Sequence, residues 1–417
     1  MRSQNNSEIQ KSKKPKILWK CGLSNTILDV LNARPGFAQT SSEDWQFYWV
    51  SRDWMNANYD RHKFKEGQLI CHFRNDWELT RKDSLIKNHK KAKKATGSLQ
   101  MDYLPASYVL PLEYHIFVEE FRKYPVDTMW IMKPVSGAQG KGIFLFKKLK
   151  DIQEWKKKGK SADSETQPYV VQSYVSRPYL IGKKKFDIRL YVLVTSFRPL
   201  NAWIHREGFA RFSHSRYTLD SFVHLTNVAI AKSAIDYDPE KGLKWSLDKL
   251  KRYILAKHGH EAVHKLLENI GLIIINIQQI IMQNPHCFEV YGYDILLDSE
   301  LKPWLLEVNA SPSLTPSSQE DFEMKFRVLS HMLDVLDFEK IRNGNETTVG
   351  GFDLLIKNNE VIYLPEAPAN NTVSQNGTIP GFFQPSMNIR IGKFRFLHRP
   401  IFQFSLSGNY VPPMQMP

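Results

Sequence analysis

Residues Tyr291 to Leu314 read YGYDILLDSELKPWLLEVNASPSL. Two apolar runs in this segment, Asp294 to Leu297 and Trp304 to Val308, flank a polar Asp-Ser-Glu turn. Short apolar runs on either side of a polar turn are typical of a β-hairpin, so we predict two antiparallel strands joined by a loop at Ser299 to Lys302. The Tyr, Leu, Ile and Trp residues in both runs indicate that the hairpin is largely buried.

Three oxygen-bearing side chains should lie on one face of this hairpin. With that loop, Asp294 lies directly across from Glu307, and Asn309 shares the face of Glu307 because side chains alternate along a strand. These side chains would converge on one patch with no basic residue between them, and like charges held so close repel each other unless a cation is present. Carboxylate and amide oxygens suit Mg²⁺, which keeps positions open for phosphate oxygens. The alternative is a hairpin with two solvated acids at its rim, although acids on an apolar hairpin usually have a partner.

A second hairpin is predicted by the segment Trp130 to Phe146, WIMKPVSGAQGKGIFLF. Its tip, Pro134 to Gly142, holds three glycines, a serine and a lysine, and backbone amides in such a loop can close over phosphates. The segment matches neither the P-loop pattern nor the kinase glycine loop. A flexible tip without a ligand is the alternative. Lys133 is more informative, because a lysine at the end of an apolar strand needs an anionic partner.

A further strand is predicted for Phe186 to Thr195, FDIRLYVLVT. Lys185, Asp187 and Arg189 share one face of this strand, and apolar residues occupy the other. Charges at alternate positions of so apolar a strand point either into a polar cleft or into water.

Four helical regions are predicted from apolar residues at helical spacing. They are a surface helix, a region opened by Lys244-Trp245, a buried helix and a helix after the metal hairpin: Leu112 to Tyr124, Lys244 to His258, Val263 to Met282 and Asp321 to Phe338. Arg81 to Lys94 is a basic stretch, helical or linking.

Composition restricts the class of protein. A chain of 417 residues with 42% apolar residues suggests two or three domains with ample cores. The longest apolar run, Gly271 to Ile281, is too short to span a bilayer, and the basic N-terminus has no apolar signal region. Three scattered cysteines form neither a disulfide framework nor a metal-binding spacing. We therefore expect a cytoplasmic protein with reduced thiols and no membrane partner.

The net charge of +14 indicates an acidic partner or a polyanion. Lysines are concentrated in runs such as Lys87 to Lys94 and Lys156 to Lys160. Nucleic acid is the usual partner of so basic a chain, but no recognition-helix, zinc-finger or RNA-binding motif appears. An acidic protein surface is equally compatible, and the lysine runs are otherwise solvated faces.

Five motifs in a fixed order resemble the tubulin tyrosine ligase-like family: WIMKPVSGAQGKGIFL, QSYV, KFDIRLYVLV, HLTN and KPWLLEVNASPSL. The resemblance covers about Trp45 to Phe352, and the variants are most similar to the glutamylase branch typified by the ninth member and then the first. It implies an α/β (α+β) protein with the ATP-grasp fold. With composition, which predicts a disordered basic N-terminus and a mostly irregular tail rich in Asn, Gly, Pro and Thr, it leads us to expect five parts. They are the N-terminus, an N-terminal α/β domain, a central domain with the glycine-rich phosphate loop, a C-terminal domain with the metal site and the tail: residues 1–16, 17–80, 81–180, 181–340 and 341–417.

The resemblance also implies roles for individual residues. Contacts with ATP are implied for the strand lysine, the glycine loop, the adenine hinge, the charged strand and the HLTN motif: Lys133, Gln139, Gly140, Gln172, Ser173, Tyr174, Val175, Lys185, Phe186, Asp187, Thr226 and Asn227. Lys82, in an Arg-Lys-x-x-Leu segment, is a weaker candidate. Asp294, Glu307 and Asn309 match the family's Mg²⁺ ligands, in agreement with the hairpin argument.

Arg211 in GFARF and Lys244 before Trp245 match the positions that hold the incoming free L-glutamate, and Arg189 is expected in the same pocket. Two cations suit a dicarboxylic substrate. One departure from the family pattern is that the segment Arg216 to Val223 is several residues shorter, which affects the expected acceptor cleft.

The function implied is ATP- and Mg²⁺-dependent ligation of glutamate to glutamate side chains in the acidic tails of tubulin, through an acyl-phosphate. The rivals are a ligase that uses glycine or tyrosine, an inactive microtubule-binding scaffold and, from charge alone, a nucleic-acid-binding protein. Microtubules would place the protein on the cytoskeleton, in a cilium or flagellum and at the basal body. Three questions stay open: whether the enzyme starts glutamate side chains or lengthens them, whether it prefers α- or β-tubulin, and whether it needs accessory subunits.

Overall fold

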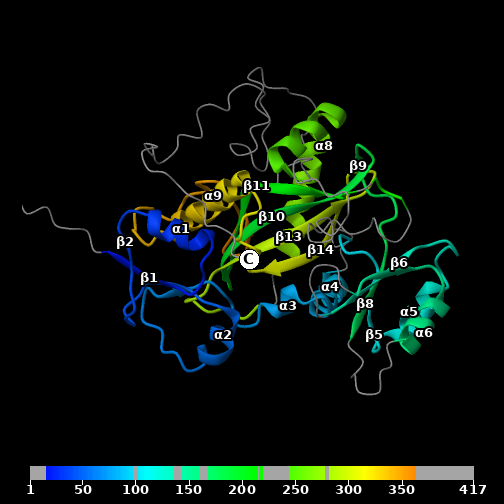
Figure 1. The fold of residues 1–417 in the computed structure, drawn as a ribbon, viewed down its shortest axis with the longest axis horizontal. Helices are drawn as coiled ribbons and strands as arrows, with labels where there is room; N and C mark the ends of the chain where they lie inside the picture. Colours follow the sequence, from blue (N-terminus) through cyan, green and yellow to red (C-terminus); the bar gives the residue numbers. More distant parts are fainter. Residues whose placement is uncertain are drawn as a thin grey trace, which may run out of the picture.

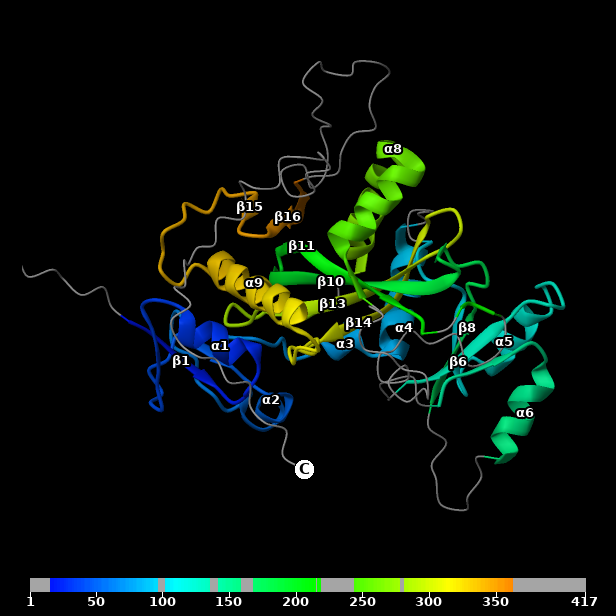
Figure 2. The same cartoon turned by 45° about the horizontal axis from the view of Figure 1, so that its top comes forward.

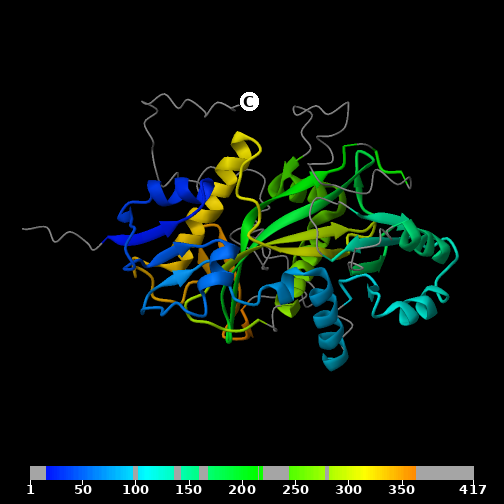
Figure 3. The same cartoon turned by 60° about the horizontal axis from the view of Figure 1, so that its bottom comes forward.

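The computed structural model describes residues 16–96, 102–135, 142–158, 168–214, 216–218, 244–277 and 281–362. Three sheets make up this part of the chain, of four, nine and four strands. The N-terminal sheet and the small sheet that carries β6 and β8 lie at opposite ends, with the large sheet between them (Figures 1 and 3). The mixture of helices and strands confirms the predicted α/β class.

The N-terminal sheet is entirely parallel, in the order β2-β1-β3-β4. Its elements in chain order are β1 (Ile17–Cys21), α1 (Thr26–Ala33), β2 (Phe37–Gln39), β3 (Phe47–Trp49), α2 (Arg52–Asn58), β4 (Leu69–Ile70) and α3 (Trp77–Thr80). Parallel neighbours need crossover connections, which α1 and α2 provide. Trp45 and Phe47 are buried in its core.

The small sheet is antiparallel, in the order β5-β8-β6-β7. Its strands are β5 (Ser107–Leu110), β6 (Trp130–Pro134), β7 (Phe144–Phe146) and β8 (Tyr169–Ser173), and its helices are α5 (Tyr114–Phe121) and α6 (Leu149–Lys158). Phe117 of α5 packs edge-on against Trp130, with ring centroids 5.1 Å apart, so this lobe has a core of its own. The helix α4 (Lys82–Thr96) joins it to the N-terminal sheet.

The central sheet is antiparallel and follows the order β14-β13-β10-β11-β16-β15, with β9, β12 and β17 paired to its sides. Its strands are β9 (Leu180–Ile181), β10 (Lys184–Phe197), β11 (Leu200–Phe212), β12 (Lys244–Ser246), β13 (Glu289–Leu297), β14 (Pro303–Ala310), β15 (Thr348–Val349), β16 (Phe352–Lys357) and β17 (Glu360–Val361). Every residue of β13 is buried, so this sheet is the centre of the core.

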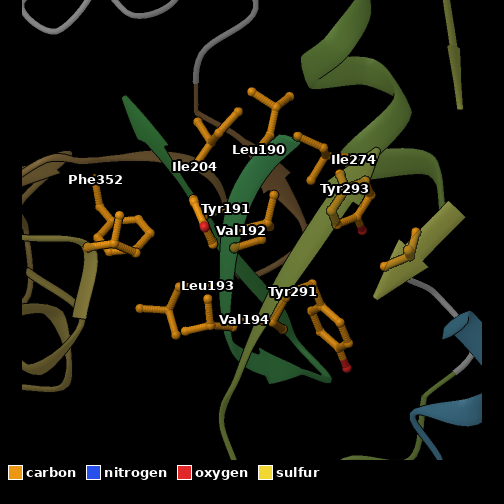
Figure 4. Packing of buried hydrophobic residues seen from close by; sticks show 14 of the residues in the cluster. Leu190, Tyr191, Val192, Leu193, Val194, Ile204, Ile274, Tyr291, Tyr293 and Phe352 are labelled. Carbon is orange, nitrogen blue, oxygen red and sulfur yellow. The ribbon is translucent and has the colours of Figure 1, made fainter. Parts of the chain in front are cut away.

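Two helices pack on the central sheet. The helix α8 (Leu247–Ile277) is broken at Gly259, where φ is 80° and ψ is 178°. Figure 4 shows Ile274 of α8 together with Leu190 of β10 and Ile204 of β11. The helix α9 (Gln319–Leu336) contacts both the sheet and α1, so it joins the N-terminal lobe to the centre (Figure 2). Within the described ranges, no helix is long and apolar enough to cross a membrane.

The hairpin prediction is confirmed. The strands β13 and β14 pair with Asp294 opposite Glu307, and one residue of irregularity follows Asp294. The hairpin of β6 and β7, the strand β10 and the helix α9 are also present where the sequence predicts them.

Two expectations about local structure are wrong. Lys244 and Trp245 belong to strand β12 rather than a helix, because the end of the long strand β11 has backbone groups that this segment satisfies. The segment from residue 348 to 361 forms strands β15 to β17, because the apolar run of β16 completes the edge beside β11. Residues 363–417 of the expected irregular tail lie outside the described residues. The predicted surface helix is confirmed as α5, with Phe117 buried and Ile116 54% exposed.

Candidate active site

A cleft of about 650 Å³ lies between the small sheet and the central sheet. The strands β6 and β8 line one wall, and β10, β11, β13 and β14 line the other. Most residues that the sequence analysis selects line this cleft: Lys82, Lys133, Gln172, Ser173, Tyr174, Val175, Lys185, Asp187, Arg189, Arg211, Lys244, Asp294, Glu307 and Asn309. Side chains separated by more than two hundred residues in the sequence therefore meet at one place.

Some selected residues are not brought to the cleft. The side chain of Phe186 points to the opposite face of β10, where it is buried between Phe212 and Tyr179, so this side chain does not line the cleft. Alternation along the strand places it there, because its neighbours in sequence face the cleft. The other unplaced residues, Gln139, Gly140, Thr226 and Asn227, lie outside the described residues, as does most of the shortened segment at residues 216–223.

The oxygen-bearing side chains of the hairpin converge as predicted. The amide nitrogen of Asn309 lies 3.3 Å from Oδ2 of Asp294 and 3.3 Å from Oε1 of Glu307. Asp294 is 2% exposed, whereas about a third of the Glu307 side chain is exposed to the cleft. Lys82 approaches the same patch, with its Nζ atom 3.8 Å from Oε2 of Glu307.

The expectation that this patch lacks a cation is wrong. Arg189 donates to Asp294 from Nε at 2.5 Å and from Nη2 at 3.0 Å, and Nη2 of Arg211 lies 2.8 Å from Oδ2 of the same carboxylate. Arg211 also donates from Nε to Oδ1 of Asp187 at 3.0 Å. Burial alone would raise the pKa of Asp294, but the two arginines outweigh it and lower that pKa to about 2.

Strand register produces this arrangement. Arg189 of β10 pairs with Asp294 of β13, and Asp187 of β10 pairs with Arg211 of β11. Side chains that are directly opposite on neighbouring strands lie within contact distance. The sequence analysis considered the hairpin without its neighbouring strand, so it missed the cations that β10 and β11 supply.

The other wall of the cleft carries a chain of neutral hydrogen bonds that ends on a lysine. Lys133 donates from Nζ to Oε1 of Gln172 at 2.9 Å, and Gln172 donates from Nε2 to Oγ of Ser107 at 2.8 Å. Ser107 in turn donates to the carbonyl of Pro105 at 2.6 Å. Burial lowers the pKa of Lys133 to about 8. Its surroundings therefore favour an anion in the cleft, which would stabilise the charged form.

A second lysine faces the same space. Lys185 is 5% exposed and donates from Nζ to the hydroxyl of Tyr174 at 3.1 Å. Burial lowers its pKa to about 8; the charge of Asp187 opposes this shift and the charge of Lys133 adds to it. Two lysines that face one cleft, the charge of one lowering the pKa of the other, are suited to a ligand with several negative charges.

The far end of the cleft holds a group that the sequence analysis only partly identified. Lys244 donates from Nζ to Oγ of Ser317 at 2.8 Å and lies 3.3 Å from Oδ2 of Asp321. Lys325 donates to the same Oδ2 atom at 3.0 Å and to the carbonyl of Thr315 at 2.7 Å. We call Lys244, Ser317, Asp321 and Lys325 the lysine corner. Asp321 and Lys325 were missed, although an acid and a lysine four residues apart at the start of a predicted helix are a recognisable pair.

Comparison with known proteins identifies the family of the chain. The model of the tubulin-tyrosine ligase family matches residues 60–343. The probable tubulin polyglutamylase ttll-9 of Caenorhabditis elegans is 62% identical over 402 residues, which cover 93% of this chain and 94% of that protein.

More distant relatives cover most of the chain too. The probable tubulin polyglutamylase TTLL9 of Bos taurus is 47% identical over 83% of this chain and 85% of its own length. The probable alpha-tubulin polyglutamylase Ttll1 of Tetrahymena thermophila is 40% identical over 75% of this chain and 85% of its own length. These matches span both walls of the cleft, and they show that the chain belongs to the tubulin-tyrosine ligase family.

Proposed function

We propose that this chain is an ATP-dependent ligase that adds glutamate to glutamate side chains in the acidic tails of tubulin. Membership of the ligase family and an ATP-grasp-like fold imply the use of ATP. The relatives named above are probable tubulin polyglutamylases, which supports glutamate as the donor and tubulin as the acceptor. The observation that carries the proposal is the cleft itself. Its wall of β6 and β8 carries Lys133, and we call it the lysine wall. The opposite wall carries Asp294, Glu307 and Asn309, which we call the carboxylate patch, and the lysine corner is separate from both.

The lysine wall would hold the nucleotide. Lys133 of this wall and Lys185, which faces it from β10, would contact its phosphates, since both are cations that line the cleft. The segment from Gln172 to Val175 would contact the adenine through its backbone. The N–H groups of Ser173 and Tyr174 already donate to Ala106 and Met129, so the carbonyl oxygens of this segment would accept from the adenine amino group.

The carboxylate patch fits Mg²⁺, and Asp294, Glu307 and Asn309 would hold it. Their side chains converge within hydrogen-bond distance, and hard oxygen ligands of this kind suit Mg²⁺. The amide nitrogen of Asn309 now lies between the two carboxylates, and rotating that amide by half a turn would present its oxygen instead. Bound there, Mg²⁺ would neutralise charge on the phosphates during transfer.

The reaction needs positioning rather than a protein nucleophile. The γ-carboxylate of the acceptor glutamate attacks the γ-phosphorus of ATP, the bond to ADP breaks, and an acyl-phosphate forms. The α-amine of free glutamate then attacks the acyl carbon and loses a proton, and phosphate leaves with the bonding electrons. Lys133 and Lys185 would stabilise negative charge on the phosphoryl group, and the buried pairs of Arg189 and Arg211 would keep the carboxylate patch in place.

The lysine corner would select the donor. Lys244 and Lys325 share the single carboxylate of Asp321, so among the described residues this corner has one positive charge in excess. Glutamate carries one net negative charge at neutral pH, whereas glycine and tyrosine carry none. Arg211 would add a further cation, although it already binds two aspartates. The charge of the corner therefore supports glutamate over the two rival donors.

The tubulin acceptor and the location of the protein are inferred from the net charge of the chain and from the relatives named above. The net charge of +14 would attract the acidic tubulin tail, with an affinity that falls as salt rises. A protein that modifies tubulin would act on the cytoskeleton, and we extend this to the cilium or flagellum and its basal body. Accessory subunits would add to the tubulin contact. The inactive scaffold is less well supported, because the lysines and oxygen ligands of the cleft are all present.

The test is incorporation of labelled glutamate into microtubules by cells that express the wild type, Glu307→Gln or Glu300→Gln. Glu300 lies on the exposed turn of the same hairpin, so its variant is a matched control. We expect incorporation with the wild type and the control and none with Glu307→Gln. Labelled glycine and tyrosine are supplied in parallel. Incorporation of one of these instead would identify a different donor, and microtubule binding without incorporation of any donor would favour the scaffold.

A further inference from the structure

A buried cluster of ionisable residues lies outside the cleft. His72, Asp76 and Glu289 are 3%, 0% and 1% exposed, and one ligand-type atom from each lies within 4.8 Å of the others. His72 and Asp76 come from the connection between β4 and α3, and Glu289 begins β13. The cluster therefore joins the N-terminal lobe to the central sheet.

The cluster is balanced in charge by protein groups. Arg52 forms ion pairs with both acids, at Asp76 and, over 3.8 Å, at Glu289. His72 donates from Nδ1 to Oε1 of Glu289 at 2.9 Å. Burial lowers the pKa of His72, but Cys71 and Glu289 outweigh it and raise that pKa well above its ordinary value. Burial and the charge of Glu289 also raise the pKa of Asp76 to about 7, so the acids carry no more negative charge than Arg52 and His72 match. The cluster therefore resembles a rigid bridge rather than a site for a further cation.

The bridge reaches the cleft through the other nitrogen of the imidazole. Nε2 of His72 lies 3.2 Å from Oγ of Ser311, which follows the metal-ligand candidate Asn309 by two residues. Ser311 has a φ of 50°, a backbone conformation that a residue other than glycine rarely adopts without support. The hydrogen bond from His72 supplies such support.

The segment that starts at Ser311 builds the lysine corner. The carbonyl of Thr315 accepts from Lys325, and the hydroxyl of Ser317 accepts from Lys244. The N-terminal lobe holds this segment a second time, because Thr26 of α1 donates to the carbonyl of Leu314 at 2.7 Å. The segment from residue 311 to 317 is therefore positioned by the N-terminal lobe and delivers its polar groups to the donor end of the cleft.

The same segment lies tightly against the central sheet. A Cβ atom on Gly292 would lie 3.0 Å from Cβ of Pro312 and 3.2 Å from Cδ of Arg189. Glycine at this position allows the segment to approach the buried arginine. A shift of Ser311 would therefore change contacts at the donor end before it changed the lysine wall, whose Lys133 is held by Gln172 of the small sheet.

We propose that His72 is a positioning residue for the donor site, because it fixes Ser311 and with it the segment from residue 311 to 317. The donor role of that site rests on the function proposed above. The consequence is that the N-terminal lobe influences the binding of the amino acid through Ser311. The cluster also reaches the cleft through the backbone of Asp76, whose carbonyl accepts from the N–H group of Thr80 at 3.0 Å.

The test compares Ser311→Ala, His72→Asn and the double variant with the wild type and with Ser299→Ala, a change on the exposed hairpin turn. In His72→Asn the side-chain amide can still donate to Glu289, while the group that reaches Ser311 is removed. Calorimetry on the purified chain measures glutamate binding with ADP and Mg²⁺ present, and nucleotide binding alone. Hydrogen exchange of the amides from residue 311 to 317 measures the segment itself.

We expect each single variant to weaken glutamate binding about tenfold and nucleotide binding less than about twofold, with faster exchange in the segment. The double variant should be no weaker than the single ones, because both remove one contact. Exchange in Ser311→Ala at the wild-type rate would overturn the positioning role, as would equal weakening of both ligands. A wild type that binds nucleotide but no glutamate would instead overturn the donor assigned under Proposed function, while the exchange measurement would still decide the positioning role.

Discussion

Lys133 and Arg189 face the same cleft from opposite walls, but their surroundings differ. Arg189 is bonded twice to the carboxylate of Asp294, so its charge is matched inside the protein. Lys133 hydrogen-bonds to the neutral amide of Gln172, and burial lowers its pKa to about 8. The arginine wall is therefore matched by hydrogen-bonded carboxylates. On the lysine wall, Lys133 has a neutral hydrogen-bond partner and only the nearby charge of Glu307 raises its pKa, so an anion in the cleft would stabilise its charged form.

This difference separates two ways in which a cation can serve a binding site. A matched cation fixes the shape of the site, and its loss should destabilise the fold. A buried lysine without a carboxylate partner costs stability in the free protein, and its loss should harm ligand binding only. The following variants test whether the two walls behave in these opposite ways.

The largest effect is expected from Asp294→Asn. This change keeps the size of the side chain but leaves Arg189 and Arg211 without their shared negative charge. Removing one partner of a buried ion pair typically costs about 3–5 kcal/mol, so the free energy of unfolding in urea should fall by that order. Glutamate incorporation should be lost, because the carboxylate is also a metal-ligand candidate. An unchanged unfolding midpoint would show that the arginine wall is not matched as described.

A smaller effect, of opposite sign on stability, is expected from Lys133→Met. The apolar side chain removes a buried charge, so the free energy of unfolding should stay equal or rise by about 1 kcal/mol. Nucleotide affinity should fall about 100-fold, because a charge-assisted hydrogen bond to phosphate contributes about 2–3 kcal/mol. Titration with a fluorescent ATP analogue measures the affinity, and Lys150→Met on the exposed face of α6 is the control. A destabilised Lys133→Met with normal nucleotide affinity would reverse the comparison.

The stability of the free protein and its nucleotide affinity should both depend on pH through the two lysines that face the cleft. The pKa of Lys133 and that of Lys185 are about 8 in the folded protein, below the ordinary lysine value. Between about pH 8 and about 10.4 the unfolded chain binds more protons than the folded one, so stability of the ligand-free protein contributed by these lysines rises with pH. Nucleotide affinity should fall over the same range, because the anion binds the protonated form.

Nucleotide affinity measured from pH 7 to pH 9.5 tests this expected fall. Each lysine that must take up a proton adds about a tenfold loss of affinity per pH unit above pH 8, and Lys133→Met should reduce that dependence by one proton. A pH dependence that is the same in the variant and the wild type would remove Lys133 from the nucleotide site.

The sequence predicts the hairpin, its register and the face that carries Asp294, Glu307 and Asn309, because these depend only on alternation within one short segment. It does not predict the pairing of Asp294 with Arg189, because that contact depends on which strand lies beside β13. The same limit explains the error for Lys244, which lies on β12 because β11 extends beyond β16. Contacts between strands that are distant in the sequence need tertiary structure, or the family resemblance that stands in for it.

The smallest effect on ligand affinity is expected from Lys325→Met. This variant tests a cation whose charge is only partly matched inside the protein. Lys325 and Lys244 share Asp321, so one charge of the pair is matched and the other is in excess. Losing Lys325 removes a buried ion pair and the donor to the Thr315 carbonyl, but Asp321 keeps Lys244, so the free energy of unfolding should fall by about 1–3 kcal/mol, less than for Asp294→Asn. Glutamate binding should weaken about five- to tenfold, since one charged contact of roughly 1–1.4 kcal/mol is lost while nucleotide binding stays normal.

The control for this variant is Lys63→Met, an exposed lysine of the N-terminal lobe that lies away from the cleft. Glutamate affinity is measured by calorimetry with ADP and Mg²⁺ present, and nucleotide affinity is measured separately. If the excess charge of the lysine corner selects glutamate, the preference of Lys325→Met for glutamate over glycine should shrink. Equal loss of affinity for glutamate and glycine would mean that Lys325 holds a group that both share, the α-carboxylate, and that selection of the side-chain carboxylate belongs to Lys244 or Arg211.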